Sequence, residues 1–307
     1  MKLRHLIGVV LLLALGHCAT AQGWRLDSRS TGLQEMMAKS AVRIETMTHM
    51  GRRNGSGLLF RVQLPENLMR HIPVVITARH LATDIQTLSL SFSVKRDERL
   101  AGKESVKFEY TKGSLTVERH PDPTVDLCAI LIGVEIYEFR KKGIELGYYG
   151  FDDSILADEA FYQNERQLDP VVMVGFQDDF LDSANLQPIF RRGVYAMNPS
   201  LDYRGRKEFL LDIPNNGGSS GSPVFRFDEK MFSDRSAGCA NITIGSRLTL
   251  VGISFDGVDP SSGTNVPRVL SGPLTSTAQI IKAVRIKELS DMLRSKCLGR
   301  QQDGQKD

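Results

Sequence analysis

Apolar residues occur along the chain in short runs, and most of these runs have the spacing of β-strands. The clearest run is TLSLSFSV (87–94), where every second position is apolar: Leu88, Leu90, Phe92 and Val94. This alternation is typical of a strand with one buried face. Similar runs predict further strands at 41–47, 55–64, 73–78, 106–110, 126–134, 170–176, 189–197, 208–213, 223–227 and 248–255.

Helical spacing is rarer. It predicts one helix at 32–39 and a second at 276–295, whose apolar face comprises Ile280, Ile281, Val284, Ile286, Leu289, Met292 and Leu293. Short, regularly spaced strands without helices between them favour an all-β fold, either antiparallel barrels or a sandwich. A polar tail, 301–307, is expected to fray.

The N-terminus has the pattern of an export signal. A basic start, MKLRH, precedes an apolar run of 11 residues, and Ala19-Thr20-Ala21 offers a cleavage site. We therefore expect a signal peptide at 1–21 and a periplasmic or secreted protein without stable membrane insertion after cleavage. A retained anchor, or a lipoprotein with Cys18 as the lipidated residue, are alternatives.

Composition limits the binding partners, disulfides and metal sites that the sequence predicts. The chain of 307 residues is 41% hydrophobic, and its formal net charge of +3 falls to +1 (3 − 2) without Lys2 and Arg4. This charge predicts no nucleic-acid partner. Cys128 lies in an apolar run and is expected to be a core thiol, whereas Cys239 and Cys297 could form a disulfide after export. No cysteine and histidine spacing suggests a metal site.

The stretch NNGGSSGSPVF (215–225) joins two strand-like runs, so a flexible linker is a poor interpretation. Glycines in such a loop allow several backbone N–H groups to point at one place, as an oxyanion hole requires. A serine nucleophile in the loop would need a histidine base and a group that orients the base.

The positions of the histidines decide between two kinds of hydrolase. The elbow G-x-S-x-G of the α/β-hydrolases fits Gly217, Ser219 and Gly221, but that fold needs a histidine after the serine, and none follows His120. The order His80, Asp126, Ser220 remains. Asp122 competes with Asp126 for the orienting role, but Asp126 begins an apolar run and is preferred. His120 is expected at the surface.

Four motifs carry a resemblance to the trypsin-like (chymotrypsin-fold) serine proteases, bacterial secreted or periplasmic members in particular. They are GSGLLF (55–60), TARH (77–80), DLCAIL (126–131) and GSSGSPVF (218–225). The spacings of 46 and 94 residues (126 − 80 and 220 − 126) are close to those of the chymotrypsin triad. The resemblance implies two six-stranded antiparallel β-barrels, roughly 38–140 and 165–275, within one protease domain at 22–300.

The resemblance also implies roles for individual residues. Ser220 would be the nucleophile, His80 the general base and Asp126 its orienting partner, with the N–H groups of Gly218 and Ser220 as the oxyanion hole. It implies peptide-bond hydrolysis of a protein or peptide substrate through an acyl-enzyme, without a cofactor. The oligomeric state stays open.

The sequence departs from digestive relatives at two positions. Ser219 stands where they have an aspartate that binds a newly formed N-terminus, and Pro214 stands where trypsin has its base-binding acid. The predicted substrate-binding residues are Pro214, Asn215, Ser254, Phe255 and Asp256. A protease-like binding protein without activity and a hydrolase of small esters are the alternatives.

Overall fold

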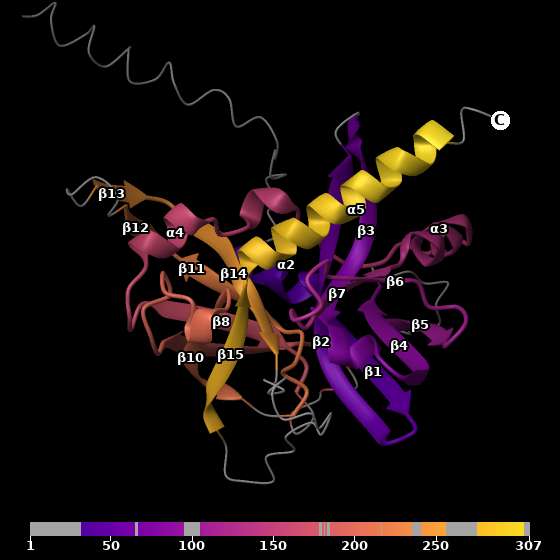
Figure 1. Cartoon of the computed structure of the whole chain (residues 1–307), viewed down its shortest axis with the longest axis horizontal. Helices are drawn as coiled ribbons and strands as arrows, with labels where there is room; N and C mark the ends of the chain where they lie inside the picture. The colour runs from indigo at the N-terminus through magenta and orange to yellow at the C-terminus, as the bar shows by residue number, and fades with distance from the viewer. Residues whose placement is uncertain are drawn as a thin grey trace, which may run out of the picture. The chain divides into compact units, whose positions relative to one another are not determined.

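The computed structural model describes residues 32–64, 67–94, 105–177, 180, 182, 185–215, 217–234, 241–255 and 275–303 (Figure 1). The chain divides into two units, residues 1–35 and 36–307. Of the first unit, only 32–35 are described, and 33–35 begin helix α2 (Leu33–Ser40). The predicted signal peptide at 1–21 lies outside the described residues. No helix in the described part of the chain is long and apolar enough to span a membrane.

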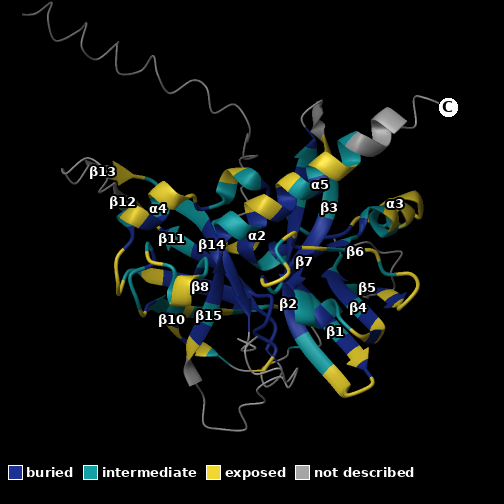
Figure 2. Ribbon diagram, viewed as in Figure 1, coloured by how far each residue is buried: buried dark blue, intermediate teal, exposed yellow. Residues whose placement is uncertain are grey.

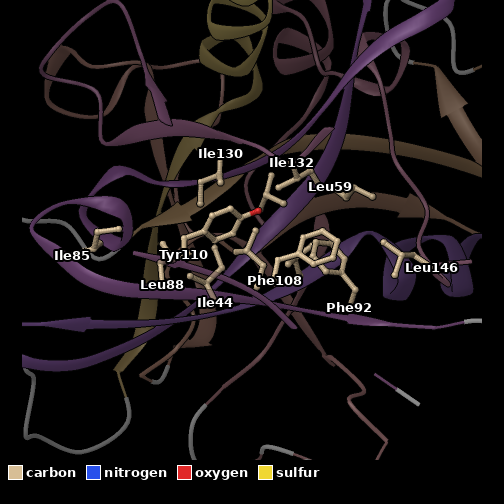
Figure 3. Close-up of a cluster of buried hydrophobic side chains, with 13 residues drawn as sticks. Ile44, Leu59, Ile85, Leu88, Phe92, Phe108, Tyr110, Ile130, Ile132 and Leu146 are labelled. Carbon is tan, nitrogen blue, oxygen red and sulfur yellow. The ribbon is translucent and has the colours of Figure 1, made fainter. Parts of the chain in front are cut away.

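The first half of the larger unit is a seven-stranded antiparallel sheet in the order β5-β4-β1-β2-β3-β7-β6. Its strands are β1 (Ala41–Thr48), β2 (Gly51–Leu64), β3 (Asn67–Ala78), β4 (Ile85–Ser93), β5 (Ser105–Thr111), β6 (Val117–Arg119) and β7 (Leu127–Leu131). Burial alternates along β1, with Val42 and Ile44 facing inward. The inward side chains form one apolar cluster that includes Leu88, Phe108 and Tyr110 (Figure 3).

The second half is a closed antiparallel barrel in the order β10-β15-β14-β11-β8-β9. Its strands are β8 (Pro170–Gly175), β9 (Ile189–Tyr195), β10 (Glu208–Asn215), β11 (Pro223–Asp228), β14 (Arg247–Phe255) and β15 (Thr275–Lys282). A separate hairpin pairs β12 (Met231–Asp234) with β13 (Asn241–Ile244). In Figure 2, buried residues follow the barrel strands.

These two halves and a C-terminal helix confirm the predicted all-β class, with seven strands rather than six in the first half. Each predicted strand overlaps an observed strand in the described part of the chain, but β2 begins four and β3 six residues earlier than predicted. Helix α2 confirms the prediction at 32–39. Two short helices, α3 (Gly133–Lys141) and α4 (Glu159–Asn164), were not predicted, because neither has a continuous apolar face.

The second predicted helix is wrong in its first third. Residues 275–282 form strand β15, and helix α5 (Ala283–Asp303) begins directly after it. Ile280 and Ile281 are both buried, because β15 lies inside a closed barrel between β10 and β14. A short apolar run that is buried on both faces has no strand periodicity, so its pattern merged with that of the helix.

Ion pairs are buried at one end of the barrel. Arg226 Nε lies 3.2 Å from Glu165 Oε2. The same guanidinium lies 2.8 Å from Asp228 Oδ1, and Asp228 also pairs with Arg247 at 2.7 Å. Because Arg226 is shared, its charge only partly offsets the burial of Glu165. Burial raises the pKa of Glu165 from 4.5 to about 7, against the opposing effect of Arg226.

This shift makes the free energy of unfolding depend on pH. A carboxyl group whose pKa is raised by folding stabilises the protein below its ordinary pKa, and this contribution is lost as the pH rises from 4.5 through 7. Glu165→Gln is therefore expected to gain stability relative to the wild type between pH 5 and pH 8. The gain is about 3 kcal/mol, at about 1.4 kcal/mol per pKa unit.

Urea denaturation at the two pH values measures this gain. The control is Glu159→Gln in α4, which removes an exposed carboxylate that pairs with Lys207 at 2.7 Å. If the wild type and Glu165→Gln differ by the same free energy at pH 5 and pH 8, Glu165 does not titrate in this range, and the prediction is wrong.

Candidate active site

Two strand ends bring His80 next to Asp126. Strand β3 ends at Ala78, and His80 follows in a single turn of 3-10 helix, η1 (Arg79–Ala82). Ala78 pairs with Leu127 at the start of β7, so the residue before β7 lies beside the turn. The backbone N–H of Arg79 donates to the Asp126 carbonyl at 3.1 Å, which fixes the two segments to each other.

The Asp126 carboxylate holds the imidazole with one oxygen and the backbone with the other. Oδ2 lies 2.6 Å from His80 Nδ1, and Oδ1 accepts the backbone N–H of His80 at 2.9 Å. An ionised carboxylate can only accept hydrogen bonds, so Nδ1 carries the proton of the neutral imidazole. Nε2 is then left with a lone pair, as a general base requires.

The loop that carries Ser220 joins β10 to β11 and is fixed on both sides by backbone hydrogen bonds. Ser56 N–H, on β2, donates to the Ser220 carbonyl at 2.7 Å. Gly221 N–H donates to the Ser254 carbonyl, on β14, also at 2.7 Å. Gly218 and Gly221 have φ values of 89° and 82°, in the left-handed region that favours glycine.

Close contacts bring this loop to the end of β3 that carries His80. A Cβ atom on Gly221 would lie 1.9 Å from the Ser56 carbonyl oxygen and 2.3 Å from Thr77 Oγ1. A Cβ atom on Gly55 would lie 2.2 Å from Leu81 Cδ1 and 3.0 Å from the Ser220 carbonyl oxygen. Glycine at these positions therefore allows the Ser220 loop to approach the residues on both sides of His80.

Side chains that the sequence did not single out support the loop. Ser56 Oγ donates to the Gly218 carbonyl at 3.2 Å and accepts the Phe176 N–H at 2.8 Å. Gln177 Nε2 donates to Ser219 Oγ at 3.1 Å. Arg191 Nε, on β9, donates to Gln177 Oε1 at 2.7 Å. Ser56 lies in the quoted motif GSGLLF, but no local pattern marks Gln177 or Arg191, because their partners are distant in sequence.

If the Ser220 loop carries out catalysis, we expect Gln177→Ala to lower kcat about tenfold. Gln177 is buried, and its loss leaves Ser219 Oγ and Arg191 without a hydrogen bond that fixes the loop beside Gly218 and Ser220. Gln187→Ala is the matched control, because Gln187 is exposed and its side chain donates a long hydrogen bond of 3.4 Å to the Asn185 carbonyl. Equal kcat values for the two variants would contradict this prediction.

The predicted substrate-binding residues occupy two strand ends. Pro214 is exposed and Asn215 half-buried at the end of β10, whereas Ser254 and Phe255 are buried at the end of β14. Ser254 contacts the Ser220 loop through its backbone: its carbonyl accepts from Gly221, and its N–H donates to Ser222 at 2.9 Å. Asp256 lies outside the described residues.

Two of the four cysteines, Cys128 and Cys297, lie in the described part of the chain. Cys128 is a core thiol, as predicted, and burial raises its pKa, so it is not a nucleophile at neutral pH. Cys297 is half-buried on α5; its predicted bond to Cys239 is not tested, because Cys239 lies outside the described residues. Within the described ranges, no group of three or more His, Cys, Asp and Glu side chains is arranged to hold a metal ion.

One prediction about the segment before Asp126 is wrong. His120 is buried rather than at the surface, with 4% of its area exposed. It lies under helix α5, and its Nε2 is 3.3 Å from Glu288 Oε2. The sequence could not show this, because Glu288 is distant along the chain.

No protein-family model and no curated protein sequence matches the chain. Similar solved structures include an HtrA-type protease, AlgW, with a tripeptide: TM-score 0.47, 13% identity, 84% of this chain and 61% of AlgW covered. Another is a serine endoprotease from Yersinia pestis, with TM-score 0.43, 12% identity, and 85% and 65% covered. A third is an inactivated protease paralogue of the scabies mite, with TM-score 0.45, 10% identity, and 83% and 95% covered. The chain thus spans less than two thirds of the length of AlgW.

Proposed function

We propose that this protein is an exported serine endopeptidase that uses His80, Asp126 and Ser220. The observation that carries the proposal is the pair of contacts from the Asp126 carboxylate to Nδ1 and to the backbone N–H of His80, at 2.6 and 2.9 Å. The Ser220 loop lies against the end of β3, just before His80, as the contacts of Gly221 and Gly55 indicate. A protein or peptide is the substrate, and the periplasm or the extracellular space is the location.

In this mechanism, His80 Nε2 takes the proton from Ser220 Oγ as the oxygen attacks the scissile carbonyl. Asp126 keeps the imidazole in the required tautomer and stabilises the imidazolium that forms. The N–H groups of Gly218 and Ser220 would stabilise the negative charge on the carbonyl oxygen, an effect typically worth 100- to 1000-fold in rate. His80 then protonates the leaving amine, and water hydrolyses the acyl-enzyme by the same steps.

A fluorophosphonate probe tests the proposal most directly. Incubation of the purified mature protein with the probe, followed by digestion and peptide mapping, should place the label on Ser220. Ser219 and Ser222 lie in the same loop, so they serve as internal controls. Label on either of them instead, or no label on a folded protein, would overturn the proposed nucleophile.

A second comparison separates peptidase from esterase activity. Casein and a p-nitrophenyl ester are given to the same preparation, with Ser220→Ala as the blank. The proposal expects hydrolysis of both, because an activated serine also cleaves activated esters. Hydrolysis of the ester alone would make the protein an esterase, and a folded protein with neither label nor hydrolysis would favour a binding protein.

A further inference from the structure

The segment between His120 and Asp126 is folded back on itself by short-range hydrogen bonds. The Asp122 N–H donates to His120 Nδ1 at 3.0 Å, and the Val125 N–H donates to the Asp122 carbonyl at 3.2 Å. The His120 N–H donates to the Leu127 carbonyl at 3.0 Å. A shift of this turn therefore moves Asp126, which lies at its end.

Asp122 joins the turn to helix α5. Its Oδ1 accepts the backbone N–H and the hydroxyl of Thr124, at 2.9 and 2.6 Å. Its Oδ2 lies 3.6 Å from Arg285 Nη2 in the first turn of α5. The Thr124 hydrogen bonds are the main cause that lowers the pKa of Asp122, with a smaller effect from Arg285. The carboxylate is thus ionised at neutral pH, and it holds the turn with one oxygen and α5 with the other.

His120 lies close to the same helix. Its side chain is fully buried, and its Nε2 lies 3.3 Å from Glu288 Oε2. Its Nδ1 accepts the backbone N–H of Asp122, whereas Nε2 makes no hydrogen bond within the described part of the chain. Burial is the main cause that lowers the pKa of His120, so the ring is neutral at neutral pH. Glu288 pairs with Arg285 at 2.9 Å.

Helix α5 is itself firmly packed, so it can serve as a fixed support. Ile286, Leu289 and Leu293 are buried on one face of the helix. Figure 1 shows α5 extending from the end of β15 diagonally across the upper part of the view, and the helix contacts β14, β2 and β7. The exposed ion pairs of α5 add little to stability, because exposed pairs contribute about 0–1 kcal/mol. An ion pair that adds little stability can still fix the position of a neighbouring loop.

We propose that Arg285 is a positioning residue, which holds the turn at 120–126 through Asp122 so that Asp126 stays in place beside His80. The inference rests on the proposed function. It gives α5 an indirect role in the reaction, which is to position Asp126. Misplacement of a reacting or orienting group by about 1 Å can lower a rate about 100-fold, so a loosened turn should be visible in catalysis.

The test compares Arg285→Ala with Lys287→Ala in the full chain. Both residues lie near the start of α5 and both make exposed ion pairs, but Lys287 pairs with Asp153 at 3.4 Å and Asp291 at 2.6 Å, away from the turn. We expect Arg285→Ala to lower kcat about fivefold to tenfold with KM unchanged. Arg285→Lys should recover most of the wild-type kcat. Lys287→Ala should stay within twofold of the wild type. Similar losses in Arg285→Ala and Lys287→Ala would overturn the proposal, because they would indicate a general effect on the helix.

A spectroscopic measurement makes the inference independent of turnover. The proton between His80 Nδ1 and Asp126 should give a far-downfield signal in proton NMR, because the two atoms are only 2.6 Å apart. The signal is recorded in Ser220→Ala, alone and combined with Arg285→Ala or Lys287→Ala. We expect it to broaden or move upfield only with Arg285→Ala. An unchanged signal there would overturn this inference, whereas absence of probe labelling in the wild type would count against the proposed function.

Discussion

Ser220→Ala is expected to lower kcat for peptide cleavage about a million-fold, to the limit of detection. Removal of the serine nucleophile from a protease triad has an effect of this size, because the remaining groups have nothing to activate. The fold should persist, since Ser220 takes part in the described backbone network through its carbonyl, which Ala also has. The measurement is cleavage of casein or a fluorogenic peptide, with circular dichroism to confirm folding.

The matched control for this variant is Ser222→Ala. Ser222 is equally buried, two residues further along the same loop, and its Oγ has no hydrogen-bond partner within the described part of the chain. Its replacement should change kcat by less than tenfold. Activity close to that of the wild type in Ser220→Ala would exclude Ser220 as the nucleophile, however the control behaves.

Asp126→Asn is expected to lower kcat about 10,000-fold at neutral pH. In the wild type, one oxygen accepts the backbone N–H of His80 and the other faces Nδ1. In the variant, the asparagine oxygen would keep the backbone hydrogen bond, so the amide NH₂ would face Nδ1. An NH₂ group donates, so the ring would need its proton on Nε2, and Nε2 could then no longer accept the serine proton.

Asp122→Asn is the control that separates the two acids considered for the orienting role. Asp122 lies in the turn that contacts α5, and its carboxylate contacts Thr124 and Arg285, so its loss should lower kcat by about tenfold at most. Steady-state kinetics at pH 7 to 8 measures both variants. A larger loss in Asp122→Asn than in Asp126→Asn would reverse the assignment of the orienting acid.

The sequence by itself determined the class of fold and the order of the chemically important residues. Alternation such as that in 87–94 predicts a strand from local burial alone, and the strand is found at Ile85–Ser93. The motifs around His80, Asp126 and Ser220 could be compared because each is short and contiguous. That the glycines of 217–221 permit a tight loop also follows from local backbone sterics, and the φ values of Gly218 and Gly221 agree with it.

Only the tertiary structure decided what depends on residues distant along the chain. Residues 275–282 form a strand because they pair with β10 and β14 and so close the barrel, although their pattern also fits a helix. His120 is buried because α5 covers it, and Gln177 supports the Ser220 loop because β8 ends beside that loop. The physical reason is the same in each case: periodicity reports how one segment divides its own faces, whereas burial and hydrogen-bond partners are set by the segment that packs against it.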